Sequence, residues 1–211
     1  MCGRPLDIRW ARDNAAAIMQ IWHPGTQGGA AVANLLLGDA VPGGKLPFTW
    51  PRHVGQVPIF YAQRKSHSPD SENKRYWNEE SEPLFPFGHG LGYSQFQFSN
   101  LRLDRAQVKV GETLKVYVDL LNEGSCRASE VVQLYIHQRY GSACRPAREL
   151  KGFERVMLGP GELRTIAFDL GPQELRYWSA AVRDWVQESA EFDIWLGGDS
   201  NASLHASFEV S

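Results

Sequence analysis

The ten residues "SEVVQLYIHQ", positions 129–138, alternate in a way that is typical of a β-strand with two covered faces. One face carries Val131, Gln133 and Tyr135, and the other carries Val132, Leu134 and Ile136. Both faces include large apolar side chains, so we expect this strand to lie at the centre of an all-β unit rather than at its edge.

Further segments of the same kind surround this strand and are separated by turn signals such as "NEG" and "GPGE". They lie at residues 114–124, 148–158, 163–170, 190–199 and 203–211. Several short strands with intervening turns predict a β-sandwich of immunoglobulin or fibronectin type over residues 96–211. No cysteine pair has the spacing of an antibody domain, which favours the fibronectin type III form. We expect Trp178, Trp185 and Trp195 to pack in the core or between domains. Exposure of either Trp178 or Trp185, which lie in a strand-turn-strand segment, is the alternative.

The N-terminal part follows a different pattern. "AAAIMQIW" (residues 15–22) is almost wholly apolar and predicts a parallel strand covered on both faces. "GGAAVANLLLGD" (residues 28–39) predicts a helix that ends at Gly38, and the chain then extends from Leu46 to Trp50. One such βαβ-type unit buries too little surface to stand alone, so residues 1–62 are interpreted as the remnant of an α/β sandwich domain.

Residues 63–95 join the two parts. Positions 63–83 are polar and without periodicity, which is typical of a functional or disordered loop. "LFPFGHGLGYSQF" (residues 84–96), called the belt below, is aromatic and rich in glycine. We expect its aromatic rings at Phe85, Phe87, Tyr93 and Phe96 to fill a seam between the two domains.

Composition excludes several functional classes. The chain has 211 residues and a net charge of −2, without the basic surplus of a nucleic-acid-binding protein. No apolar run is long enough for a membrane span, and the first residues lack a signal-peptide core, which leaves the compartment unknown. The histidines are not spaced as metal ligands, so we expect neither a metal nor a cofactor. Cys126 and Cys144 flank a strand and are predicted to be free thiols.

Five segments occur in an order that resembles one family: "GRPLDI", "AAIMQIWHPGTQGGAAVANLLLGD", "PGGKLPFTWPRHVGQVPIFY", "EPLFPFGHGLGYSQF" and "RPARELKGFERVMLGPGE". Together they are similar to the C-terminal third of family 3 glycoside hydrolases, the group of β-glucosidases and β-xylosidases. The resemblance covers residues 3–198. It implies the end of an α/β sandwich domain followed by a fibronectin type III-like domain, which agrees with the patterning.

The resemblance also implies a retaining β-glycosidase that acts on terminal β-linked sugars. Such enzymes use a carboxylate nucleophile and a carboxylic acid on either side of the scissile bond. In this family the nucleophile lies in a barrel domain and the acid lies upstream of the "GRP" stretch, and neither motif occurs here. We therefore assign no catalytic residue, expect the chain alone to be inactive, and expect a role in bracing the catalytic domains.

Two sets of residues are candidates for contact with a sugar. Trp22, His23 and Gln27 follow the end of the first predicted strand, where open α/β sheets bind their ligands. They are hypothesised to shape the rim of the parent enzyme's pocket, with interdomain packing as the alternative. Glu79, Glu80 and Glu82 lie in the loop before the belt and are more simply explained as a solvated acidic loop.

Two other roles stay open at this point. The sandwich with its three tryptophans is also compatible with a carbohydrate-binding module or a protein-interaction module. In either case we expect Ile18, Ile21, Leu35 and Leu36 to leave an apolar surface uncovered, and hence self-association.

Overall fold

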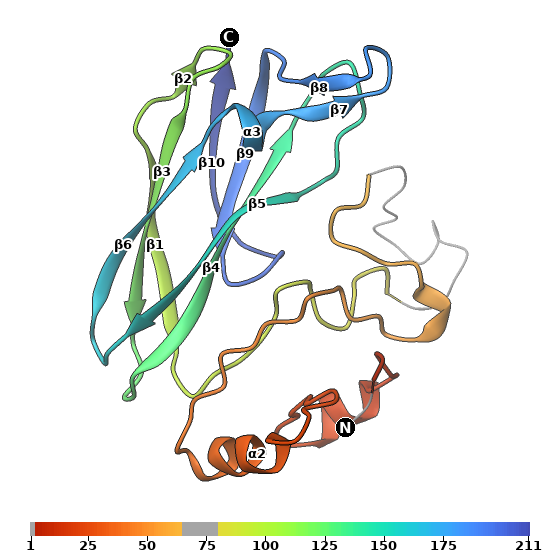
Figure 1. Cartoon of the computed structure of the whole chain (residues 1–211), viewed down its shortest axis with the longest axis vertical. Coiled ribbons are helices and arrows are strands. Elements are labelled where there is room, and N and C mark those ends of the chain that lie inside the picture. Colours follow the sequence, from red (N-terminus) through yellow and green to blue (C-terminus); the bar gives the residue numbers. More distant parts are fainter. Residues whose placement is uncertain (1–2, 65–79) are drawn as a thin grey trace.

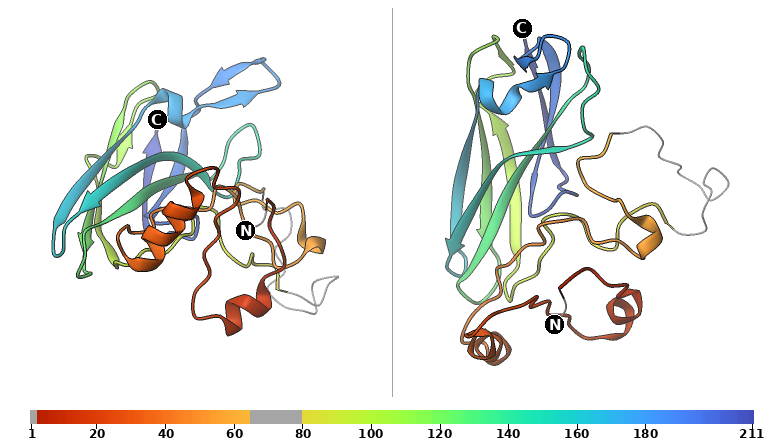
Figure 2. Two further views of the ribbon diagram at one scale, coloured as in Figure 1. Left: turned by 60° about the horizontal axis from the view of Figure 1, so that its bottom comes forward. Right: turned by 45° about the vertical axis from the view of Figure 1, so that its right-hand side comes forward.

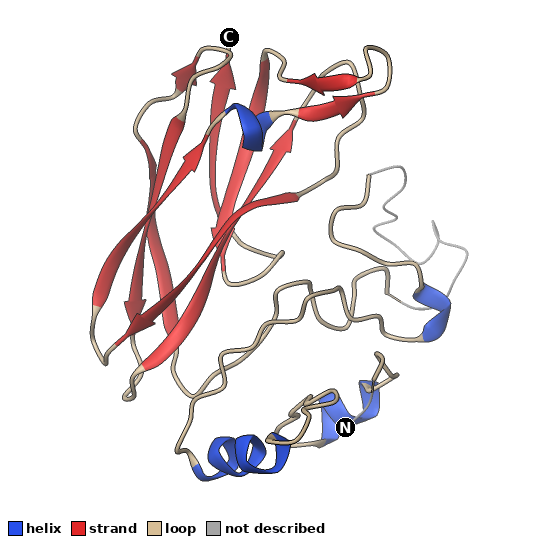
Figure 3. Ribbon diagram, viewed as in Figure 1, coloured by secondary structure: helices blue, strands red, loops and turns tan. Residues whose placement is uncertain are grey.

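The computed structural model describes residues 3–64 and 80–211. A twisted β-sandwich forms the larger part, and an N-terminal segment with little regular structure lies beneath it (Figure 1). The predicted fold class, a partial α/β unit followed by a fibronectin type III-like sandwich, is confirmed. Figure 3 shows that the strands gather in the sandwich, which also holds one short helix, while the other helices lie in the N-terminal segment.

The sandwich consists of two sheets and a small hairpin. One sheet has the order β1-β3-β6, with β1 (Phe96–Leu103), β3 (Leu114–Asn122) and β6 (Leu163–Leu170). The other has the order β2-β10-β9-β4-β5, with β2 (Gln107–Val108), β10 (Leu204–Val210), β9 (Ala190–Gly197), β4 (Ala128–Gln138) and β5 (Glu149–Leu158). A short helix, α3 (Pro172–Leu175), precedes the hairpin of β7 (Tyr177–Ser179) and β8 (Asp184–Val186). The strand pairs are antiparallel except for β2 with β10.

The core lies between the two sheets and follows the predicted alternation. From β4, Val132, Leu134 and Ile136 are fully buried against residues of the other sheet, such as Val118 and Leu120 of β3. Each fully buried aliphatic side chain of this kind stabilises the fold by roughly 1.5–3 kcal/mol relative to an exposed one. The sandwich therefore has its own continuous apolar core.

The opposite face of β4 is also buried, although no second sheet covers it. Gln133 is 3% exposed and Tyr135 is fully buried. Tyr61 contacts the Tyr135 ring edge-on at 5.7 Å and stacks on Phe87 of the belt at 4.4 Å. The belt and the N-terminal segment thus supply the layer that covers Gln133 and Tyr135 on the outer face of β4.

The N-terminal segment contains α1 (Arg9–Asn14), α2 (Gly28–Leu37) and a 3-10 turn, η1 (Val54–Gln56). The predicted helix is confirmed as α2. Gly38 ends it in the left-handed region at φ 84°, and its N–H bonds to the carbonyl of Leu35. Glycine adopts this conformation without the Cβ clash that other residues incur.

The predicted strand at residues 15–22 is not formed. These residues belong to no helix or strand, because no neighbouring strand pairs with them within the described part of the chain. The expected extended segment from Leu46 to Trp50 bends at Pro47 and Phe48, and its partner is the belt, through a bridge between Trp50 and Phe85. The two halves of the expected βαβ unit therefore do not share a sheet here.

Two smaller expectations have different outcomes. Cys126 and Cys144 are free thiols, as predicted. The expected packing of Trp178 and Trp185 is wrong, since the two rings lie 54% and 52% exposed on the β7–β8 hairpin. Within the described residues, no helix is both long enough and apolar enough to cross a membrane.

Candidate functional site

The belt runs antiparallel to residues 46–50, and the two segments lie side by side beneath the sandwich (Figure 2). The N–H of Leu46 bonds to the carbonyl of His89 at 2.8 Å, and the N–H of Gly88 returns to the carbonyl of Leu46 at 2.8 Å. At the other end, the N–H of Trp50 bonds to the carbonyl of Phe85 at 2.9 Å. Backbone hydrogen bonds therefore join the N-terminal segment to the belt as one layer.

Polar side chains tie this layer to the sandwich, and we call their contact surface the seam. Lys45 forms an ion pair with Glu130 of β4 at 2.6 Å, with both side chains at most 15% exposed. Gln133 of β4 donates to the carbonyls of Gly88 and Gly198, and Arg155 of β5 donates to the carbonyl of Gly43 at 2.9 Å. The seam is thus specified by partnered polar groups as well as by rings.

The rings of the belt only partly have the role that was predicted for them. Phe87 lies in the seam, whereas Phe85 stacks on His89 at 5.0 Å and Phe96 packs against the sandwich core. Tyr93 is 51% exposed and donates to the carbonyl of Leu35 at the end of α2. Because its hydroxyl reaches the last turn of a helix, Tyr93 ties α2 to the belt instead of filling the seam.

His89 faces an acidic partner across the seam. Its Nδ1 lies 3.6 Å from a carboxylate oxygen of Asp199, in the turn after β9. Burial tends to raise the pKa of Asp199, but the bond from His89, the N–H of Asn201 and the charge of Lys45 outweigh it and hold that pKa below its usual range. Asp199 is therefore ionised at neutral pH.

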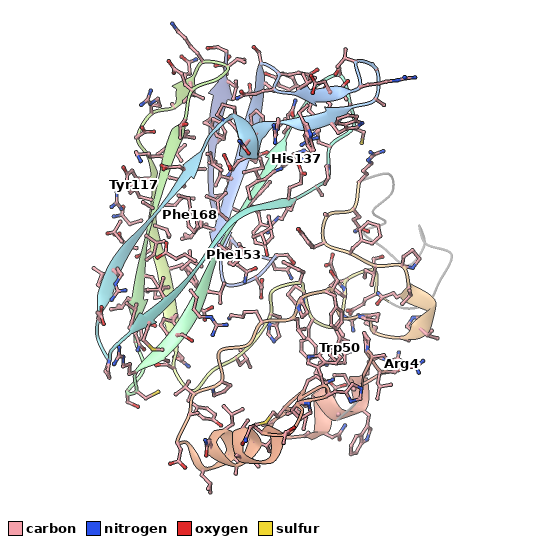
Figure 4. The ribbon with its side chains drawn as sticks, in the orientation of Figure 1. Arg4, Trp50, Tyr117, His137, Phe153 and Phe168 are labelled. Atoms are coloured by element: carbon pink, nitrogen blue, oxygen red, sulfur yellow. The ribbon has the colours of Figure 1, made fainter. Side chains whose placement is uncertain are left out.

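A pocket of about 830 Å³ opens between the N-terminal segment and the outer face of the five-stranded sheet. One wall is the loop from Thr49 to Arg64, and the other includes His137 of β4, Trp195 of β9 and Arg148, which directly precedes β5. In Figure 4, His137 lies on the sandwich and Trp50, next to Thr49, lies in the N-terminal segment. The pocket is therefore a junction of the two parts of the chain.

Specific hydrogen bonds hold the two walls of the pocket in place. The N–H of Ala147 bonds to the carbonyl of Gln63 at 2.9 Å, which joins the loop directly to the sandwich. Gln56 accepts from the N–H of Arg52 at 2.7 Å and donates to carbonyls of residues 80–82. Arg148 lies over the Trp195 ring at 4.5 Å and donates to the carbonyls of Ser200 and Ala202. These contacts preform the pocket.

The floor of the pocket includes a buried carboxylate. Asp193 accepts two hydrogen bonds from Arg139, at 2.7 and 2.9 Å, and lies 2.7 Å from Nε2 of His205. The bonds from Arg139 and then that from His205 outweigh burial and hold the pKa of Asp193 below its usual range. This charge is already neutralised by its own partners and is poorly suited to bind a cation.

Replacing Asp193 with asparagine is expected to lower the free energy of unfolding by about 2 kcal/mol at pH 7, since it removes charge-assisted hydrogen bonds. A carboxyl group whose pKa is depressed in the folded state stabilises the protein above its unfolded pKa, about 3.9. That stabilisation is lost as the pH falls through the folded pKa. Urea denaturation of the unmodified chain and of the variant should show that the difference between their free energies of unfolding becomes smaller from pH 7 to pH 3. A constant difference would contradict this account.

The predicted rim residues Trp22, His23 and Gln27 do not line this pocket. Trp22 has φ 47°, and its ring contacts those of Phe48 and Trp50 at 5.7 and 5.9 Å. His23 and Gln27 are exposed on the approach to α2. The arrangement brings Trp22 into an aromatic cluster and leaves the other two at the surface. The hypothesis that they border a sugar pocket remains a prediction.

The carboxylates of the predicted acidic loop have separate places. Glu80 forms an ion pair with Arg52, and Glu82 lines the pocket. Glu79 lies outside the described residues. No group of three or more histidine, cysteine, aspartate or glutamate side chains within residues 3–64 and 80–211 is arranged to hold a metal ion. The pocket itself, with its walls far apart in the sequence, could not be identified from sequence patterns.

Comparison with known proteins shows to which family the chain belongs. The sequence model of the glycosyl hydrolase family 3 C-terminal domain matches residues 1–93, and that of the fibronectin type III-like domain matches residues 130–200. The chain belongs to glycosyl hydrolase family 3. It represents the C-terminal region of that family, as the ordered segments predicted.

Relatives of known identity share this region. The chain is 36% identical, over its whole length, to a periplasmic β-glucosidase of Salmonella typhimurium and 40% identical, over 95% of its length, to a β-xylosidase of Formosa agariphila. The structure of a β-glucosidase from Erythrobacter marinus matches the entire chain at 37% identity with a TM-score of 0.91. A β-glucosidase of Listeria innocua in complex with glucose matches 99% of it at 31% identity with a TM-score of 0.90.

The chain spans only about a quarter of each relative. It corresponds to 28% of the Salmonella protein, 27% of the Formosa protein and 27% of the Erythrobacter chain. The family region and its fold are therefore established for this chain, and the activity of a complete enzyme is a matter for inference.

Proposed function

We propose that this chain forms the C-terminal part of a retaining β-glycosidase that removes terminal β-linked glucose or xylose. It does not supply the catalytic carboxylate pair, and its role is to brace the domains that do. Support comes from the names of its relatives, β-glucosidases and β-xylosidases, and from the match along its whole length. The observation that supports the bracing role is the seam. Its polar contacts and rings hold the described part of residues 1–93, the stretch that matches the family 3 model, against the sandwich.

An uncovered apolar surface supports the proposed role in bracing the catalytic domains. Leu36 and Leu37 at the end of α2 are 70% and 78% exposed, and Trp10 of α1 is 75% exposed. Ile18 and Met19, in the apolar segment between the helices, are also exposed. Apolar side chains gathered on one segment are typical of a protein contact surface. We assign this surface to the catalytic domains of the enzyme.

The isolated chain is therefore expected to self-associate through this surface. Replacing Leu36 and Leu37 with serine should shift it towards the monomer, because about 25 cal/mol are lost for each Å² of apolar area no longer buried. Light scattering over a range of protein concentrations measures the effect. Val110→Ser is the control, since Val110 is also an exposed apolar residue, at 49%, but lies on the sandwich. An unmodified chain that stays monomeric at high concentration would refute the expectation.

The catalytic half of the proposal is tested by joining this chain to the N-terminal part of the Salmonella relative, in place of that protein's own matching region. The chimera should hydrolyse an aryl β-glucoside, while the relative without its C-terminal region should lose activity. A Leu36→Ser, Leu37→Ser version of the chimera should be less stable than the unmodified one. Equal activity of the truncated relative and the chimera would argue against the bracing role.

A further inference from the structure

The pocket between the N-terminal segment and the sandwich contains polar groups that the chain itself does not satisfy. Thr49 is 6% exposed, yet its Oγ1 has no hydrogen-bond partner among the described residues, and neither does the buried Oγ of Ser81. Both residues line the pocket. A buried hydroxyl without a partner costs about 1–3 kcal/mol, and a ligand that bonds to it recovers this cost.

Aromatic and amide side chains line the same space. Phe60 is 53% exposed although it lies in the pocket wall, and Tyr61 is fixed beside it by stacking on Phe87. Gln63 and Asn201 bring amide groups that donate as well as accept. Exposed ring faces offer a surface for C–H groups, while amides and hydroxyls suit a ligand that is itself both donor and acceptor.

The charges of the lining do not favour an ion. Arg64 and Arg148 are present together with Glu82 and Asp193. Arg148 is occupied by two carbonyls and the Trp195 ring, and Asp193 by Arg139 and His205. A ligand with a strong charge of either sign would therefore face a group of the same sign. A neutral, polyhydroxylated molecule fits this balance better.

The size and stability of the pocket also suit a small ligand. Its volume of about 830 Å³ lies within the range of roughly 300–1,000 Å³ that is usual for small-molecule sites. The Ala147–Gln63 bond and the contacts of Gln56 fix the walls without a ligand. Binding would thus leave the walls in place, but the side chains of Thr49 and Ser81 have to turn, because both hydroxyl oxygens are closed to solvent in the chain without a ligand.

We propose that this pocket binds a short, neutral oligosaccharide, with a sugar ring against Phe60 and hydroxyl groups bonded to Thr49 and Ser81. This proposal rests on the proposed function only for the choice of the sugars to be tested. β-Linked sugars are chosen because the relatives' names indicate them. The sugar is held by residues of this chain, so binding does not depend on catalytic activity or on further domains.

Titration of the 211-residue chain with cellotriose and with xylotriose, followed by calorimetry and tryptophan fluorescence, tests this site. Trp195 in the wall provides the fluorescence signal. We expect saturable binding of at least one sugar with a Kd of about 1 mM or tighter. Absence of saturable binding of both sugars at millimolar concentration would overturn the proposal.

Two variants locate the binding in the pocket. Phe60→Ala should weaken it about tenfold by removing the ring surface. Thr49→Val should weaken it about fivefold by removing the unsatisfied hydroxyl, and it should not reduce thermal stability, because valine has nearly the same shape and carries no unpaired group. A purely structural Thr49 would leave sugar binding unchanged. Loss of stability in Thr49→Val would show that the hydroxyl already has a partner and would count against the site.

Phe153→Ala serves as the matched control. Phe153 is 70% exposed on β5 and does not line the pocket (Figure 4). Sugar binding should be the same as in the unmodified chain. Binding that survives in Phe60→Ala and Thr49→Val would place the sugar elsewhere and overturn the proposal. The titration is independent of the chimera assay, so failure of one leaves the other intact.

Discussion

Replacing Gly88 with alanine is expected to lower the free energy of unfolding by about 4 kcal/mol, from two effects that act at the same atom. Gly88 has φ 82°, which an L side chain adopts only with strain. A Cβ atom would also lie 2.2 Å from Oε1 of Gln133. That amide is fixed by the hydroxyl of Tyr135 and by the carbonyls of Gly88 and Gly198, so it has no room to move away.

Gly111→Ala separates the two effects. Gly111 has φ 90°, but nothing lies within 4 Å of the position of an added Cβ. This variant should cost only about 1–2 kcal/mol, from backbone strain alone. Urea denaturation measures both variants, and amide hydrogen exchange at Leu84, Phe85 and Gly88 reports whether the belt has detached. Equal costs at Gly88 and Gly111 would show that the seam is not closely packed around Gln133.

Replacing Lys45 with methionine should lower the free energy of unfolding by about 3 kcal/mol, because it leaves Glu130 buried without its partner. The ion pair spans 2.6 Å, and Lys45 Nζ also donates to the carbonyl of Gly90 at 2.8 Å. Methionine keeps the apolar stem of lysine, so the loss reports the charge and its hydrogen bonds. Replacing Glu130 with glutamine in the same protein should recover part of the lost free energy of unfolding.

The exposed pair of Lys115 and Asp169 provides the control. Its distance of 2.8 Å is similar, but its side chains are 51% and 62% exposed. Solvent screens such a pair, so Lys115→Met should have a much smaller effect than Lys45→Met. Similar losses for the two variants would mean that the seam pair is no more important than a surface contact.

Sequence patterns predicted the sandwich well, for a physical reason. In β3 and β4, alternation records which side chains enter the core. The turns "NEG" and "GPGE" mark where β3 and β5 end. The first strand, β1, was not identified separately because its aromatic start was assigned to the belt. The strand predicted at residues 15–22 failed because an apolar run records burial, whereas a strand also requires a neighbour to pair with.

The candidate site was harder to predict than the fold. The pocket joins residues 49–64 to residues 137–148 and 193–201, which no local pattern connects. Its most informative group, Thr49, is an ordinary threonine in sequence and becomes unusual only because its hydroxyl is buried without a partner. His89 of the belt likewise has its acidic partner, Asp199, more than a hundred residues away in the sequence.

The most direct test of the account is the hydrolysis of p-nitrophenyl β-D-glucoside and β-D-xyloside by this chain alone and by its chimera with the N-terminal part of the Salmonella relative. We predict that the isolated chain releases p-nitrophenol no faster than buffer does, and that the chimera restores turnover lost on truncation of the relative. Steady turnover by the isolated chain, retained after repurification, would contradict the central claim that the catalytic pair lies outside it.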